Sequence, residues 1–185
     1  MNIRSDLPMT KEAFLRWAER QEETYEYVRG RPVMMVRVTR NHGLLTSNLL
    51  LLLRTALPRE NWNVFADALG VDVGESLRCP DLIVEPAGGA GDETLSAAPV
   101  LIAEILSPSS LATDLSEKPA EYTALPSLLA YVVLAQNEAR LWLWQRGEDG
   151  TFPHAPEMID GTDAVLPLAG LGLALPLAAI YEGVA

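Results

Sequence analysis

The stretch "VLIAEILSPSSLATDLSEKPAEYTALPSLLAYVVLA", residues 100–135, carries the strongest indication of the fold. Residues 100–107 are apolar at almost every position, which is typical of a strand buried in the centre of a sheet. Roughly residues 109–125 are more polar and helical in character, and residues 129–135 form a second apolar run. We therefore expect a strand, a helix and a further strand in this order.

The rest of the chain continues this mixture of helices and strands. Helical spacing predicts a helix over residues 10–23, with Thr10 as its N-cap, and a leucine-rich helix over residues 41–57, which Pro58 ends. Extended runs are predicted over residues 25–38, with a turn at Arg29-Gly30, and over residues 62–73, 82–85 and 139–146, with weak strands near 151–159 and 164–166. Since strands and helices do not alternate regularly, this order predicts an α+β fold with a mostly antiparallel or mixed sheet flanked by helices.

Length and composition limit the classes of protein to which the chain can belong. With 185 residues, 49% of them apolar and 21% charged, we expect one domain over residues 1–185. The longest apolar run, residues 49–53, is too short to cross a bilayer, and residues 1–8 lack a signal-peptide stretch, so we expect a cytoplasmic protein. One cysteine and two separated histidines build neither a disulfide nor a zinc cage, which leaves oxygen ligands for any metal. The net charge of −11 argues against broad attraction to polyphosphates.

Two carboxylates stand where apolar side chains are expected. Glu104 lies inside the apolar run, where an unpaired carboxylate costs several kcal/mol to desolvate, and Asp81 opens another apolar run directly after Pro80. Two carboxylates on neighbouring strands are an arrangement that Mg²⁺ prefers. In the alternative interpretation, Asp81 is a turn residue and Glu104 pairs with an arginine such as Arg78 or Arg140.

Lys118 is the cation that could accompany these carboxylates. The helix that follows the strand of Glu104 can fold its amine back over that strand. Two carboxylates and a lysine suit phosphoryl transfer, because a metal polarises the phosphate while an ammonium stabilises developing negative charge. Alternatively, Lys118 is a solvated helix residue. For Asp114 we expect a cap or surface residue, and for His42 a polar cap or a substrate contact.

Several motifs resemble a known family. They are "YEYVRGRPVMM" (25–35), "NHGLLTSNLLLLL" (41–53), "CPDLIVEP" (79–86) and the block at 98–134. In this order they resemble the Uma-type putative restriction endonuclease family, a branch of the PD-(D/E)XK nuclease superfamily, over about residues 10–146. The most specific part is residues 99–122, in which Glu104, the residues at 106–109, Asp114, Lys118 and Tyr122 fall at the family's spacing.

This resemblance implies a restriction-endonuclease-like fold and a DNA substrate. It implies Asp81 and Glu104 as ligands of Mg²⁺ or Mn²⁺, Lys118 as the catalytic lysine, and Glu26 as an additional acidic residue of the site. From the sequence alone, Glu26 is as readily an ion-pair partner of the neighbouring Arg29 or Arg31 as it is a metal ligand. Because cutting both strands of a duplex commonly requires two active sites, we expect a homodimer.

The chain also departs from the superfamily pattern. The usual lysine position, two residues after the glutamate, is occupied by Leu106, so the charge has to come from Lys118. Pro119 disfavours helical geometry at Lys118, unless the helix restarts there with Pro119 in its first turn.

Three hypotheses about function follow. The first is a metal-dependent nuclease, the second a catalytically degenerate member of the fold that acts as a binding or assembly module, and the third an unrelated α+β enzyme. A basic rim of Arg37, Arg40 and Arg54 around the site would favour the nuclease.

Overall fold

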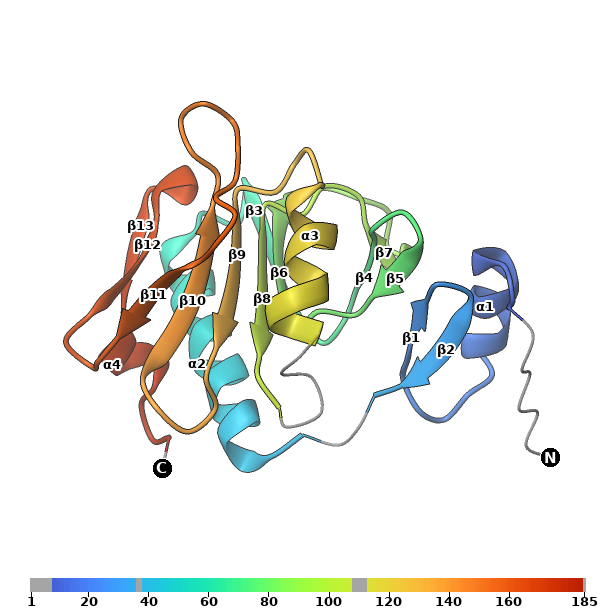
Figure 1. The fold of residues 1–185 in the computed structure, drawn as a ribbon, viewed down its shortest axis with the longest axis horizontal. Helices are drawn as coiled ribbons and strands as arrows, with labels where there is room; N and C mark the ends of the chain where they lie inside the picture. Colours follow the sequence, from blue (N-terminus) through green and yellow to red (C-terminus); the bar gives the residue numbers. More distant parts are fainter. Residues whose placement is uncertain (1–7, 36–37, 108–112, 185) are drawn as a thin grey trace.

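A six-stranded mixed sheet forms the centre of the molecule (Figure 1). The computed structural model describes residues 8–35, 38–107 and 113–184. In the sheet, β8 (Leu101–Ile105) lies between β6 (Leu82–Pro86), its antiparallel neighbour, and β9 (Ala130–Leu134), its parallel neighbour. The remaining strands, all antiparallel to their neighbours, are β3 (Trp62–Ala66), β10 (Arg140–Gln145) and β11 (Glu157–Asp160). The prediction of a mixed sheet with residues 100–107 at its centre is therefore confirmed.

Each face of this sheet packs against a different helix. The alternation of side chains along β8 sends Leu101, Ala103 and Ile105 to one face and Ile102 and Glu104 to the other. The first face, which we call the α2 face, packs against the leucines of α2 (Arg40–Ala56), namely Leu45, Leu49 and Leu53. The second, the α3 face, packs against α3 (Lys118–Thr123) through Tyr122. Glu104 therefore points toward α3.

A second, five-stranded sheet lies beside the first and carries the N-terminal hairpin (Figure 1). Arg29 and Gly30 both adopt positive φ, at 47° and 91°, which suits the tight turn of a hairpin. The predicted hairpin and its turn are confirmed. In spatial order, the strands are β2 (Arg31–Met34), β1 (Tyr25–Val28), β5 (Ser76–Arg78), β4 (Gly70–Asp72) and β7 (Leu95–Ser96).

The first helix, α1 (Lys11–Ala18), packs on the hairpin. Thr10 is its N-cap, as predicted, because its side chain accepts a hydrogen bond from the amide of Ala13. The buried ring of Phe14 contacts Tyr27 of β1, with ring centroids 5.4 Å apart. The helix ends at Ala18, whereas the spacing of apolar residues predicted that it continues to residue 23.

The segment before α3 is a π-helical turn rather than a regular helix. This turn, η1 (Thr113–Glu117), leads directly into α3, which begins at Lys118 with Pro119 in its first turn. The proline therefore restarts the helix, in agreement with the more favourable of the two expectations. Residues 108–112, which include the start of the predicted helix and part of the family motif at 106–109, lie outside the described residues.

The C-terminal segment adds a small two-stranded sheet to the α2 face. It comprises β12 (Val165–Leu168), a 3₁₀ turn at Ala169–Leu171, β13 (Leu173–Pro176) and α4 (Leu177–Ile180). Leu166, Leu175 and Leu177 bury their side chains in the same core as the α2 leucines. The weak strands predicted in this region correspond to β11 and β12, but β13 and α4 were missed because such short elements carry little periodicity. None of the described helices is long and apolar enough to cross a membrane.

Candidate active site

The strand register brings Asp81 and Glu104 together. Leu82 of β6 pairs with Ala103 of β8 in an antiparallel ladder, so extending the register by one residue places Asp81 opposite Glu104. Asp81 Oδ2 accepts a hydrogen bond from the amide of Ile105 at 2.6 Å. Both carboxylates are buried, with 7% and 4% of their surface exposed. The two acidic residues predicted from sequence are thus neighbours in space.

Lys118 extends into the same cluster. Its Nζ lies 2.7 Å from Glu104 Oε1 and 2.9 Å from Asp114 Oδ1, and α3 holds it there because its first turn begins at this residue. Lys118 is 6% exposed, which contradicts the interpretation as a solvated helix residue. Asp114 is 1% exposed, so the expectation of a cap or surface residue was wrong. The π-helical turn buries Asp114 and keeps it within reach of the amine.

Tyr122 completes the contacts of Glu104. Its hydroxyl donates to Glu104 Oε1 at 2.9 Å, and its ring packs on Tyr131 of β9 with centroids 5.0 Å apart. The sequence did not identify Tyr122 as a partner of Glu104. The available signal was its spacing of four residues from Lys118, which places both side chains on one face of a helix.

Glu26 reaches the cluster from the other sheet. Its Oε1 accepts a hydrogen bond from the amide of Cys79 at 3.1 Å and lies 3.8 Å from Lys118 Nζ. Its Oε2 accepts from Arg78 at 3.1 Å. Glu26 is therefore an ion-pair partner of Arg78 and not of Arg29 or Arg31, the arginines considered from sequence.

Arg78 binds the cluster through Glu26, and its hydrogen bonds within the described part of the chain do not include Glu104. Its guanidinium makes two hydrogen bonds to the carboxylate of Glu121, at 2.7 and 3.0 Å, in addition to the bond to Glu26. Arg140 pairs with Glu138 and Asp160 at the surface. The alternative in which Glu104 pairs with Arg78 or Arg140 is therefore wrong, because its partner is Lys118.

His42 was expected to be a polar cap or a substrate contact; it lines the pocket and is not the helix cap. Its Nε2 lies 3.1 Å from Asp81 Oδ2, and the residue is 4% exposed. The helix cap is Thr39, whose hydroxyl accepts the hydrogen bond from the amide of His42 at 3.3 Å. Burial by itself would lower the pKa of His42, but the hydrogen bond and charge of Asp81 raise it.

The cluster holds four carboxyl groups, of Glu26, Asp81, Glu104 and Asp114, but only two side chains that are lysine or arginine, Arg78 and Lys118, among its described residues. Burial raises the pKa of Glu104 to about 8, because the opposing influence of Lys118 is partly offset by Asp81 and Asp114. Burial also acts to lower the pKa of Lys118, but the surrounding carboxylates raise it overall, so the amine stays an ammonium ion. Additional positive charge would be favourable at this place.

These side chains line one side of a pocket of about 460 Å³. Its acidic lining residues are Glu26, Asp81, Glu104 and Asp114, whereas Arg78 and Lys118 are the lysines and arginines within the described part of that lining. The apolar lining residues come mainly from the hairpin and the segment after it, and include Val28, Val33, Met34, Met35 and Val38. The pocket lining thus combines charged and apolar side chains.

The carboxylates fit a metal ion that keeps part of its coordination shell in water or substrate. Within the described ranges, no three His, Cys, Asp or Glu side chains are placed to surround a metal ion. Among the described residues, the hydrogen bonds to Asp81 go to Oδ2 and those to Glu104 go to Oε1. Asp81 Oδ1 and Glu104 Oε2 accept no hydrogen bond from a described donor. Mg²⁺ is commonly held by one or two carboxylates together with waters and substrate phosphates, which this pair can provide.

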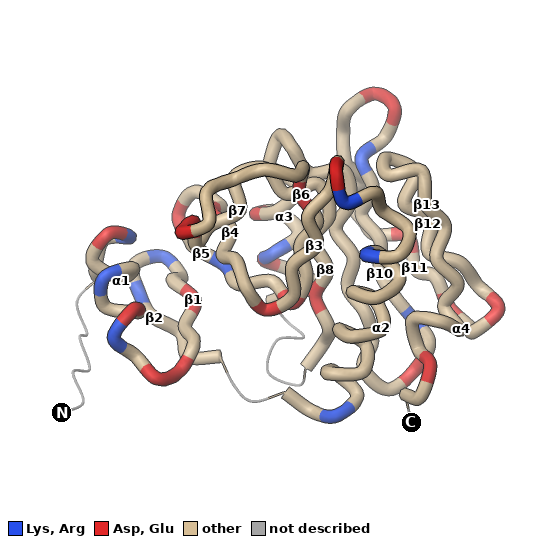
Figure 2. The backbone as a smooth tube through the Cα atoms, turned by 180° about the vertical axis from the view of Figure 1, so that it is seen from behind, with Lys and Arg blue, Asp and Glu red and all other residues tan. Residues whose placement is uncertain are grey.

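Arg40 and Arg54, two of the three arginines whose gathering around the site would favour a nuclease, do not form one patch. Arg40 begins α2 and Arg54 lies near its end, about 21 Å away at 1.5 Å rise per residue, while Arg37 lies outside the described residues. Figure 2 shows Lys and Arg scattered along the chain among more numerous acidic residues.

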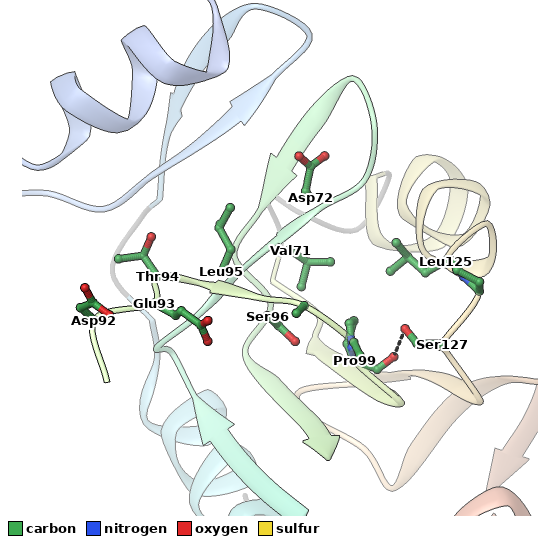
Figure 3. A pocket seen from close by; sticks show the side chains of 13 residues that line it. Val71, Asp72, Asp92, Glu93, Thr94, Leu95, Ser96, Pro99, Leu125 and Ser127 are labelled. Carbon is green, nitrogen blue, oxygen red and sulfur yellow. Dashed lines mark hydrogen bonds between the residues drawn. The ribbon is translucent and has the colours of Figure 1, made fainter. Parts of the chain in front are cut away.

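A second groove, of about 750 Å³, does not combine carboxylates with a lysine or a histidine in its described lining (Figure 3). It runs along β4, β7 and the turn after α3, where Ser127 donates a hydrogen bond to the carbonyl of Pro99 at 2.8 Å. Its described lining has acidic and apolar residues but no histidine, cysteine, lysine or arginine. The candidate active site is therefore the smaller pocket.

Asp81 and Glu104 lie side by side at neighbouring strands of a mixed sheet, and Lys118 of the next helix contacts Glu104. The fold is restriction-endonuclease-like. The chain belongs to the Uma2 family, described as "Putative restriction endonuclease", whose model matches residues 11–178. This membership contradicts the third hypothesis, an unrelated α+β enzyme.

Two cyanobacterial proteins and one crystal structure are similar to this chain. The protein slr1290 of Synechocystis sp. (strain ATCC 27184 / PCC 6803 / Kazusa) is 27% identical over 183 residues, which are 96% of this chain and 93% of the relative. The protein sll1609 of the same strain is 28% identical over 146 residues, 76% of this chain and 82% of the relative. The crystal structure of a putative nuclease belonging to DUF820 from Anabaena variabilis ATCC 29413 has a TM-score of 0.77 at 18% identity, over 96% of this chain and 100% of the other. At that identity the structure shows that the fold is shared.

Proposed function

We propose that this protein is a Mg²⁺- or Mn²⁺-dependent endonuclease that hydrolyses DNA phosphodiester bonds. The observation that carries the proposal is the meeting of Asp81, Glu104 and Lys118 in one pocket, with the Lys118 amine 2.7 Å from Glu104. Family membership supports it, because the family is described as "Putative restriction endonuclease".

In this proposal Asp81 and Glu104 hold the metal ion. They do so through the oxygens that no described donor engages, and the surplus negative charge of the cluster favours a divalent cation. When bound, the ion supplies positive charge to the phosphate and makes water more acidic.

Lys118 acts as a charge and not as a base. The carboxylates around it keep it protonated, so it stabilises the negative charge that develops on the phosphate during attack. Glu26 and Asp114 act on Lys118, from 3.8 and 2.9 Å, and thereby keep its amine directed at the cluster. Glu26 is thus an acidic member of the catalytic group whose own oxygens are occupied by Arg78 and the Cys79 amide.

We further propose that the active protein is a cytoplasmic homodimer of a single domain, residues 1–185. Cutting both strands of a duplex is served by two active sites, one on each protomer. Light scattering coupled to gel filtration measures the mass directly, and a mass of one chain, 20.2 kDa, would contradict the dimer.

The competing function is a degenerate module that binds without catalysis. The net charge of −11 favours it, since duplex binding usually draws on clustered basic residues. Pro119 no longer favours it, because the proline occupies the first turn of α3 and Lys118 points at Glu104.

A plasmid-nicking assay across Mg²⁺ and Mn²⁺ distinguishes the two functions. The wild type should nick the plasmid, and Glu104→Gln and Lys118→Ala should each abolish nicking. The sequence holds two lysines, so Lys11→Ala, in α1, is the matched control and should nick as the wild type does. Nicking that persists in Lys118→Ala would remove the lysine from the mechanism. Metal binding without nicking by the wild type would favour the module.

A further inference from the structure

We infer that His42 is a positioning residue that fixes Asp81 for metal binding, an inference that rests on the proposed function. Asp81 directly precedes β6 and lines the pocket. Its Oδ2 lies 3.1 Å from His42 Nε2 and 2.6 Å from the amide nitrogen of Ile105. Two donors from two separate elements, α2 and β8, therefore hold one oxygen.

Fixing one oxygen determines where the other one points. With Oδ2 bound to His42 and Ile105, the carboxylate plane cannot turn without breaking a buried hydrogen bond. Oδ1 is then the oxygen left for an ion in the pocket that Asp81 and His42 both line. The partners of metal-ligating carboxylates commonly act in this way, and their loss weakens metal binding about 10- to 100-fold.

The imidazole is itself held in place. His42 is 4% exposed, and its Nδ1 lies 3.5 Å from the hydroxyl of Thr46, one turn further along α2. The Thr46 hydroxyl also donates to the carbonyl of His42 at 3.0 Å, which anchors it to the same turn of the helix. The ring therefore presents Nε2 to Asp81 from a rigid helix end.

The geometry favours positioning over direct coordination. No cluster of three potential ligands that includes His42 is placed to surround an ion in the described chain. The Nε2 atom, which would have to face the metal, is already directed at Asp81 Oδ2.

The test measures Mn²⁺ affinity calorimetrically on the untagged full chain. His42→Leu, which fills the buried space without a donor, should weaken Mn²⁺ binding about 10- to 100-fold. His42→Gln, which can donate to Asp81, should recover most of that loss. His154→Ala changes the only other histidine, which is exposed, and should bind as the wild type does. If His42 only supported the fold, His42→Leu and His42→Gln with equal secondary structure should bind Mn²⁺ equally well. Tighter binding by His42→Gln alone would therefore indicate positioning.

Electron spin echo envelope modulation of Mn²⁺ bound to the wild type detects nitrogen nuclei coupled to the ion. This second measurement does not depend on the folding of a variant. Positioning predicts no directly coordinated imidazole nitrogen, so a strong nitrogen coupling would overturn the inference by making His42 a ligand. Wild-type affinity in folded His42→Leu would overturn it as well, and would leave the proposed function intact. If the wild type binds no Mn²⁺ at all, the proposed metal site fails and the inference fails with it.

Discussion

The two faces of the six-stranded sheet are built from the same strands but bury opposite kinds of side chains. On the α2 face, leucines of α2 pack on Leu101, Ala103 and Ile105 of β8 without a charged group among them. On the α3 face, the same strand contributes Glu104, which needs Lys118 and Tyr122 as partners. The α2 face stabilises the fold by removing apolar surface from water. On the α3 face, part of that stabilisation is offset by the cost of removing charged groups from water.

This difference teaches where function can reside in the fold. A carboxylate in the interior is stable only if every neighbour is arranged to compensate it, and that arrangement also fixes its position. The α3 face is therefore both the weaker core and the better site. Four experiments test whether the two faces differ in this way.

The largest effect on stability is expected from Lys118→Met. Removing the ammonium leaves Glu104 and Asp114 without their cation in a buried setting, which costs about 3–5 kcal/mol of unfolding free energy. Urea denaturation measures this loss, and Lys11→Met, at a partly exposed ion pair, should cost less than about 1 kcal/mol. Equal losses in both variants would show that the cluster is not held by Lys118.

A loss of comparable or slightly smaller size is expected from Leu49→Ala on the α2 face. Leu49 is buried in the larger core, and its truncation removes transfer free energy and leaves a cavity, about 2–5 kcal/mol in all. Unlike Lys118→Met, this variant should keep its Mn²⁺ affinity within about twofold of the wild type, because Leu49 is not among the described residues that line the pocket. A large change in affinity would mean that the two faces are coupled. Denaturation and calorimetry on the same preparation provide both numbers.

Mn²⁺ should stabilise the α3 face of the wild type. Binding to the native state alone adds about 2.7 kcal/mol when the ion is present at 100 times its Kd, which a thermal melt records as a higher Tm. Glu104→Gln should remove this rise because it takes away one of the two proposed ligands. The control is Glu157→Gln, at an exposed position of β11, which should show the full rise. A rise of equal size in Glu104→Gln would contradict the ligand assignment.

The smallest effect is expected from Pro119→Ala. The fixed φ of proline suits the first turn of α3, so its loss should change the unfolding free energy by less than about 1 kcal/mol. Nicking at saturating Mn²⁺ should stay near that of the wild type, because Lys118 is already directed at Glu104. A tenfold increase in the variant would show instead that the proline holds the lysine away from its working position.

The central features of the fold, and the main residues that meet in the candidate site, could be predicted from the amino-acid sequence. The apolar run at residues 100–107 is typical of a buried strand, and a glutamate inside it needs partners. Those two facts identified β8 and Glu104, and the ordered motifs identified Asp81, Lys118 and Glu26. Periodicity likewise found α2 and the N-terminal hairpin, because strong local patterns are independent of distant contacts.

Which of these groups contact one another could not be predicted without the three-dimensional fold. That Glu104 pairs with Lys118, and Arg78 with Glu26 and Glu121, depends on the register of strands from two sheets and on a π-helical turn, none of which has a local signature. The contact of His42 with Asp81 arises in the same way, from elements far apart in the chain. Asp114, by contrast, reaches Lys118 over four positions of the chain, through the π-helical turn. An ion pair is selected by distance in three dimensions and by the cost of leaving a buried charge alone, and both quantities exist only after the chain has folded.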